Sequence, residues 1–94
     1  MSTEVRHAPE AHRYELWEDD SMVGIADYRP GADGTVVFPH TEISPARRGE
    51  GLGEVLVRGA LDDVRTRGER IVPACWFVAD FVQANPEYQD LLAA

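Results

Sequence analysis

The chain has 94 residues, and its formal net charge of −8 comes from 17 acidic residues against nine basic ones, all arginine. A chain of this length fits one domain with one modest core. The sequence contains no apolar run close to the roughly 20 residues that a membrane-spanning helix needs. The negative charge argues against a nucleic-acid partner and favours a cationic small molecule or a basic partner. The simpler interpretation is that the charge only keeps the protein soluble.

The first segment, residues 1–11, shows little periodicity. We expect a loose arm there, followed by a single domain over residues 12–94. The segment is polar and contains acids, which is not typical of a signal peptide, so we expect a cytoplasmic protein.

Three strands are expected over residues 12–19, 22–29 and 35–43. In the first, Tyr14 and Leu16 share one face, and polar residues and a tryptophan alternate with them. The turn sequences DDS and PGADG separate the three segments. Short links between consecutive strands predict an antiparallel meander.

A helix is expected after this meander, because apolar residues then recur at spacings of three and four: Leu52, Leu56, Val57, Ala60, Leu61 and Val64. Gly68 fits the C-terminal cap of this helix.

The segment RIVPACWFV, residues 70–78, reads as a buried strand interrupted by Pro73, which indicates either a sheet edge or a place where neighbouring strands part. A short helix (ADFVQA) and a final turn with one or two helical turns (NPEYQDLL) complete the chain. The order β-β-β-α-β-α predicts an α+β fold with one sheet covered by helices.

The stretch ARRGEGLG carries glycines at positions 49, 51 and 53, just before the expected helix. Glycines let a ligand approach the backbone, and the unpaired amides of a helix start favour an anion. The stretch fits neither a P-loop, since Glu54 follows Gly53, nor a dinucleotide fingerprint, whose third glycine comes one residue later. A plain turn without a ligand remains the alternative.

The pattern Arg48-x-x-Gly51-x-Gly53 resembles the acyl-coenzyme A pyrophosphate loop of the GNAT superfamily of N-acetyltransferases. From about Tyr14 to Leu92 the chain resembles the small single-domain members of that superfamily, most clearly in HTEISP, RRGEGLG, IVPACWFV and NPEY. One departure is Asn85, where the family more often has histidine.

This resemblance implies a truncated acetyltransferase fold that binds acetyl-coenzyme A beside the glycines. The pantetheine arm would lie along the end of the third expected strand, and the pyrophosphate would meet backbone amides and an arginine. The cofactor-binding residues expected on this basis are Ile43, Ser44, Arg47, Arg48, Gly49, Glu50, Gly51, Leu52 and Gly53.

Two residues are candidates for catalysis. Cys75 lies where the family places a cysteine near the thioester, and it is either a nucleophile that forms an acyl-enzyme or a buried core residue. His40 is either a base for the incoming amine or a structural histidine. Glu42 could act as a base or bind a cationic acceptor, but a solvated carboxylate is the simpler interpretation. Tyr88 could protonate the departing thiolate, although packing is favoured.

The sequence therefore predicts an acetyl-coenzyme A-dependent N-acetyltransferase, acting by direct transfer or through Cys75. The acceptor is an unidentified amine, on a small molecule or a protein, and the chain is expected to be a monomer or a weak dimer without nucleic-acid or membrane partners. The alternatives are a non-catalytic coenzyme A-binding protein and a protein-interaction module.

Overall fold

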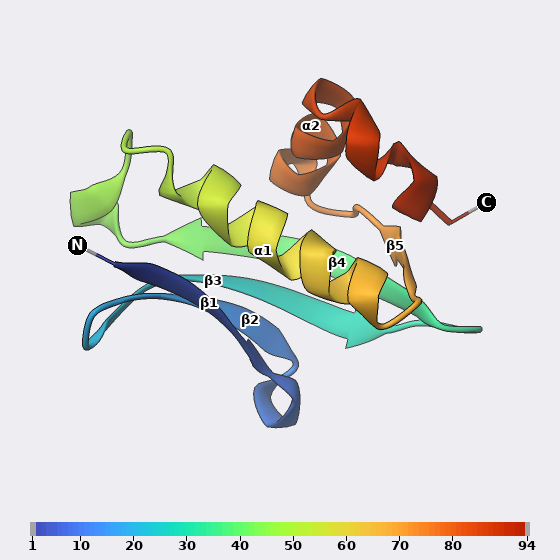
Figure 1. Cartoon of the computed structure of the whole chain (residues 1–94), viewed down its shortest axis with the longest axis horizontal. Coiled ribbons are helices and arrows are strands. Elements are labelled where there is room, and N and C mark those ends of the chain that lie inside the picture. The colour runs from blue at the N-terminus through green and yellow to red at the C-terminus, as the bar shows by residue number, and fades with distance from the viewer. Residues whose placement is uncertain (1, 94) are drawn as a thin grey trace.

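Five strands form one sheet, and two helices cover one of its faces (Figure 1). The computed structural model describes residues 2–93. The strands are adjacent in chain order, namely β1 (Thr3–Ala8), β2 (Arg13–Glu18), β3 (Ser21–Pro30), β4 (Thr35–Ile43) and β5 (Arg70–Val72). Strands β1 to β4 pair antiparallel, and β5 pairs parallel to β4. The α+β class and the expected meander, now β2 to β4, are confirmed.

The expected loose arm is wrong over β1, because Thr3–Ala8 pairs along its whole length with β2. Val5, opposite Leu16, lies against helix α1 (Leu52–Thr66) close to Gly59. The segment is short and mostly polar, so its own pattern is weak. Pairing with β2 and packing against the helix decide its structure, and local propensity does not. A 3-10 turn, η1 (Pro9–Ala11), joins it to β2.

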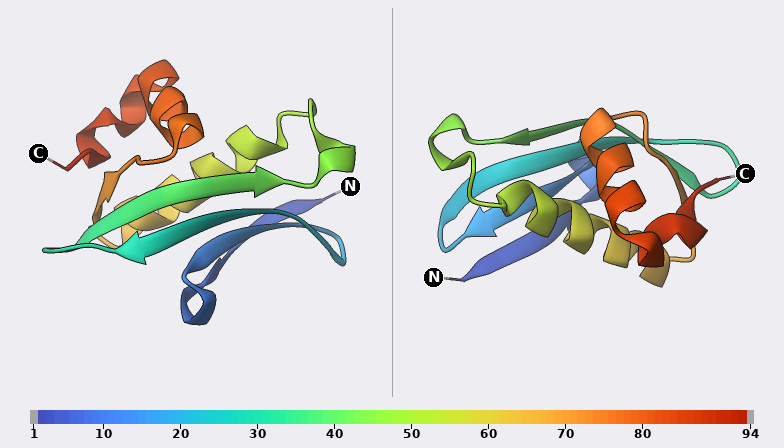
Figure 2. Two further views of the ribbon diagram at one scale, coloured as in Figure 1. Left: turned by 180° about the vertical axis from the view of Figure 1, so that it is seen from behind. Right: turned by 90° about the horizontal axis from the view of Figure 1, so that it is seen from above.

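Helix α1 begins and ends as its sequence predicts. It lies across the sheet (Figure 2) and buries the expected apolar face against it. At its end the Glu69 N–H donates to the Val64 carbonyl at 3.1 Å and the Gly68 N–H to the Arg65 carbonyl at 3.0 Å. Gly68 has a φ of 72°, so these bonds form a Schellman cap, which confirms the predicted stop.

The strand expected over residues 70–78 is shorter than predicted. β5 ends at Val72, and the apolar residues that follow belong to helix α2 (Trp76–Ala84). Pro73 has no N–H for a strand ladder, and Val78, Phe81 and Val82 are buried at helical spacing. A short apolar run fits a strand or a helix equally by composition, and here the helical period applies.

The core lies between the sheet and the helices. After α2 the chain forms a 3-10 segment, η3 (Pro86–Leu91), and returns to β5 through a bridge between Ile71 and Leu92. The largest side chains with almost no exposure are Tyr14, Leu16, Phe38, Leu56, Val57, Leu61, Val64, Ile71 and Val78. Among residues 2–93, neither helix has the length and apolar character needed to cross a membrane.

Candidate active site

Strands β4 and β5 separate soon after they begin to pair. The paired residues end at Val37 and Val72, whereas β4 continues to Ile43. The Cys75 N–H still donates to the Phe38 carbonyl at 2.7 Å, and the chain then turns into α2. Within residues 2–93, the second half of β4 therefore has no strand beside it on this edge. This confirms that the strands part at Pro73.

A cleft of about 700 Å³ occupies the space where the strands part. It is bounded by the second half of β4, the segment before α1 and the start of α2. Its lining residues are Pro39, His40, Thr41, Glu42, Ile43, Arg47, Arg48, Gly49, Gly51, Leu52, Gly53, Glu54, Ala74, Cys75, Trp76 and Phe77. The volume lies in the range of small-molecule sites.

The cleft brings together most of the residues expected from the sequence. Both catalytic candidates line it, and so do seven of the nine expected cofactor residues; Ser44 and Glu50 do not. Ser44 lines a separate shallow pocket beside β3, and the Glu50 carboxylate binds Arg47.

We call residues 44–51 the glycine loop. It contains the 3-10 turn η2 (Pro45–Arg47), and it has positive φ angles at Gly49 (85°) and Gly51 (77°). Gly51 is the N-cap of α1 and supplies no side-chain cap, so the first amides of the helix have no side-chain acceptor. The space beside both glycines is open, because an added Cβ would meet nothing within 4 Å. These features fit an anion that approaches the backbone.

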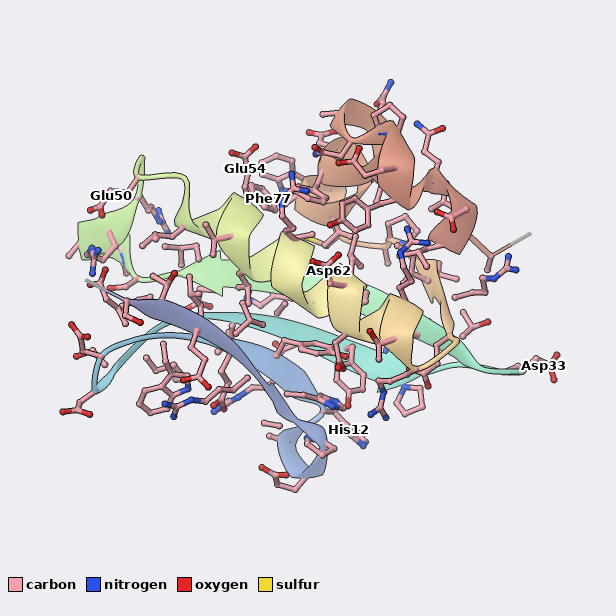
Figure 3. The ribbon with its side chains drawn as sticks, in the orientation of Figure 1. His12, Asp33, Glu50, Glu54, Asp62 and Phe77 are labelled. Carbon is pink, nitrogen blue, oxygen red and sulfur yellow. The ribbon has the colours of Figure 1, made fainter. Side chains whose placement is uncertain are left out.

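Gly53 has a different reason to be glycine. It lies in the first turn of α1, where an added Cβ would come within 2.7 Å of Phe77 Cζ. Phe77 lies over the start of α1, close to Glu54 (Figure 3). No local sequence pattern indicates this contact, since the two residues are far apart along the chain.

The two arginines of the loop have different surroundings. The Arg47 guanidinium donates to the carboxylates of Glu18 and Glu50, and these bonds raise the pKa of Arg47 and lower that of Glu18. Arg48 is exposed and lines the cleft, and it makes no side-chain hydrogen bond or ion pair with residues 2–93. Arg48 is therefore the arginine available to a phosphate.

Cys75 lies at the N-cap of α2, not on the strand expected over residues 70–78. The residue is 8% exposed and lines the cleft, so it is both a core residue and a cleft residue. Its Sγ lies 3.7 Å from Thr41 Oγ1. Within the described chain, this hydroxyl is the only side-chain hydrogen-bond partner of the thiol.

His40 and Glu42 form an exposed pair on the cleft-facing part of β4. His40 Nε2 lies 3.1 Å from Glu42 Oε1. A carboxylate that accepts from one imidazole nitrogen leaves the other nitrogen as the proton acceptor, so the pair suits a general base.

Tyr88 and Asn85 lie outside the cleft. The Tyr88 hydroxyl donates to Asp62 Oδ1 at 2.7 Å, and burial together with this bond raises the pKa of the phenol. Asn85 donates to the Phe81 carbonyl at 2.8 Å and accepts from Arg58 at 3.1 Å. Both side chains hold η3 against α1 and α2, which confirms the packing role favoured for Tyr88.

The profile of the GCN5-related N-acetyltransferase family matches residues 13–91. The chain belongs to this family. Its relatives include protein NATD1 of Bos taurus, which is 40% identical over 51 residues; this match covers 54% of the chain and 45% of the cow protein. The chain thus spans about half the length of such relatives.

Solved structures of GCN5-related proteins share the fold. A GCN5-like protein from Staphylococcus aureus, determined by NMR, superposes with a TM-score of 0.73 over 97% of this chain and 88% of its own, at 20% identity. A GNAT-family protein from Desulfovibrio desulfuricans superposes with a TM-score of 0.55 at 34% identity, over 63% of this chain and 40% of its own. The resemblance that the sequence motifs indicate is confirmed.

Proposed function

We propose that this GCN5-related chain is an acetyl-coenzyme A-dependent N-acetyltransferase that transfers the acetyl group directly to an amine. The observation that carries the proposal is the cleft where β4 and β5 part, with the glycine loop at one end and His40 and Cys75 in its lining. The loop offers what phosphates need: helix amides without a side-chain cap, two glycines with open space beside them, and Arg48, which makes no side-chain ion pair within residues 2–93.

Bound acetyl-coenzyme A would supply an acetyl thioester, whose C–S bond breaks as the acceptor nitrogen forms the new C–N bond. Arg48 and the first amides of α1 would hold the phosphates. His40, oriented by Glu42, would accept the proton that the amine loses. Backbone groups along the unpaired edge of β4 would orient the pantetheine arm.

The surroundings of Cys75 favour direct transfer over an acyl-enzyme. A thiol becomes a nucleophile through an adjacent base or through nearby positive charge such as a helix start. Within residues 2–93 the side-chain partner of Cys75 Sγ is the neutral Thr41 hydroxyl at 3.7 Å, so the N-cap position of Cys75 would have to activate the thiol alone. In this proposal Cys75 shapes the cleft wall and does not form a bond to the acetyl group.

Turnover and intact mass test this proposal together. We expect wild type to release coenzyme A from acetyl-coenzyme A when amine acceptors such as spermidine or a lysine-containing peptide are added. His40→Gln should lower kcat by about 100-fold, because a positioned base contributes about that factor or more. Cys75→Ala should retain activity within a few-fold, and His12→Asn, at an exposed position far from the cleft lining, is the matched control.

The chain has no lysine, so an added acetyl group would report on Cys75, a hydroxyl or the N-terminus. A stable acetyl adduct that disappears in Cys75→Ala, with loss of turnover, would overturn direct transfer and support the acyl-enzyme. If acetyl-coenzyme A binds but no amine tested is acetylated, the result would support the non-catalytic alternative. If acetyl-coenzyme A neither binds nor stabilises the fold, the proposed function is wrong.

A further inference from the structure

The glycine loop has little packing to hold it in place. Pro45, Ala46 and residues 48–51 are exposed, and two of its glycines have positive φ angles. Ser44 and Arg47 are the exceptions: Ser44 is half-buried at the end of β4, and the Arg47 side chain is only 24% exposed. Beyond Ser44, the conformation of the loop therefore depends strongly on the contacts of the Arg47 side chain.

Arg47 links the loop to the sheet and also links two parts of the loop to each other. Its Nη1 and Nη2 donate to the two carboxylate oxygens of Glu18, the second at 2.9 Å. Its Nε donates to Glu50 Oε2 at 3.1 Å, and Nη2 also donates to Glu50 Oε1 at 3.0 Å. One guanidinium thus holds the end of β2 and the far side of the loop together.

Glu18 is a rigid support for this contact. It is the last residue of β2 and lies between β1 and β3, opposite Thr3 and Ser21. Its side chain is only 12% exposed. A bidentate contact between arginine and carboxylate fixes the orientation of the two groups as well as the distance between them. The end of β2 therefore sets the position of the loop.

We infer that Glu18 is a positioning residue for the cofactor, holding the glycine loop through Arg47 in the conformation that binds the phosphates of coenzyme A. Arg47 then acts as the tether, and Arg48 acts as the direct phosphate contact. The inference rests on the proposed function, since it assigns a role within the same cofactor site. Glu18 lies outside the cleft and outside the motif, so the sequence pattern did not identify it.

The physical reason is preorganisation. A loop that is already ordered loses less conformational freedom when a ligand binds, and the ligand then binds more tightly. With the tether removed, the two glycines would let the loop sample many conformations, of which few would present the amides correctly.

Glu18→Gln distinguishes Arg47 as a tether from Arg47 as a phosphate ligand, because the two roles predict different changes in the affinity for coenzyme A. The change removes a negative charge near an anion site and weakens the hold on Arg47. If Arg47 bound phosphate itself, coenzyme A would bind more tightly or equally. If Arg47 is a tether, coenzyme A should bind about tenfold more weakly, against the electrostatic trend.

The measurements are the Kd of coenzyme A by calorimetry and the kinetic constants for acetyl-coenzyme A. For Glu18→Gln we expect Kd and KM to rise about tenfold, while kcat and the KM of the amine stay within about twofold. Asp20→Asn is the matched control, because it removes one charge from the neighbouring turn at an exposed residue without contact to Arg47; it should leave all constants unchanged.

Glu50→Gln gives an independent test if Glu18→Gln does not fold. Its side chain is exposed and holds the other side of the same guanidinium, so it should weaken coenzyme A binding in the same direction. Binding that is equal or tighter in a folded Glu18→Gln or Glu50→Gln overturns the inference. Failure of wild type itself to bind coenzyme A would instead refute the proposed function.

Discussion

Gly51 and Gly53, on either side of the first residue of α1, are glycines for different structural reasons. Gly51 has a positive φ angle, which a residue with a Cβ adopts at a cost of roughly 1–2 kcal/mol. Gly53 has an ordinary helical backbone, and a Cβ there would clash only with the ring of Phe77. A motif shows both as glycine, but substitution should separate them.

Gly51→Ala should lower the free energy of unfolding by about 1–2 kcal/mol, because nothing relieves the strain of its backbone. Gly53→Ala should change stability by less than about 1 kcal/mol, because the gain in helix propensity opposes displacement of the Phe77 ring. Urea unfolding of both variants measures the difference. Equal losses would contradict the distinction.

At the scale of elements, the close approach of α1 to β1 depends on Gly59. A Cβ at this position would lie 2.5 Å from Val5 Cγ2 and 2.8 Å from Val5 Cβ. The nearer atom is the end of a side chain, but the second belongs to a stiff branched carbon, so the strand itself would have to move. In the sequence Gly59 is only a weak point of a helix, whereas in the structure it allows the edge strand to dock.

Gly59→Ala should therefore destabilise the fold by about 1–3 kcal/mol, as overpacking does, despite alanine's better helix propensity. In a Val5→Ala background the same substitution should be neutral or stabilising, because the obstructing methyl groups are gone. A double-mutant cycle by urea unfolding measures the coupling. If the two effects are additive, β1 does not depend on this contact.

At the scale of the whole molecule, three tyrosines join segments that are distant in the chain. Tyr14 of β2 donates to Asp63 of α1 at 2.7 Å, and Tyr88 of η3 donates to the adjacent Asp62 at 2.7 Å. Tyr28 of β3 is hydrogen-bonded to His7 of β1. Burial raises the pKa of all three phenols, and the aspartates raise it further for Tyr14 and Tyr88.

These shifts predict a loss of stability in alkali. The native state favours the neutral phenols, and unfolded tyrosine ionises near pH 10, at about its reference pKa. The stabilisation should thus be complete below about pH 10 and decline as the pH rises further. Urea unfolding and tyrosinate absorbance between about pH 8 and 11.5 test this, in a Cys75→Ala background that removes the only thiol.

Tyr14→Phe and Tyr88→Phe are the companion variants for this titration. Each should be less stable at neutral pH and should lose less stability in alkali. Free energies that stay level to about pH 11 would show that the phenols ionise without cost to the fold.

The sequence predicted the elements whose pattern is local. The helix from Leu52 and its glycine stop follow from periodicity and cap chemistry, and the glycine loop follows from a short motif. Strand β1 and the start of α2 were not predictable in this way, because pairing with β2 decides the first and a short apolar run such as WFV fits either a strand or a helix. The contact of Arg47 with Glu18 also joins segments that are distant in the sequence, so no local pattern signals it.

The exposed indole at the cleft has a practical consequence for spectroscopy. Trp76 is 73% exposed and lines the cleft, whereas Trp17 lies on β2, outside the cleft lining, under the guanidinium of Arg6 at 4.5 Å from its ring centre. With Trp17 replaced by phenylalanine, selectively excited tryptophan fluorescence would come only from Trp76 in the cleft lining, apart from the emission of the three tyrosines. The protein thus carries a built-in optical reporter for its own cleft.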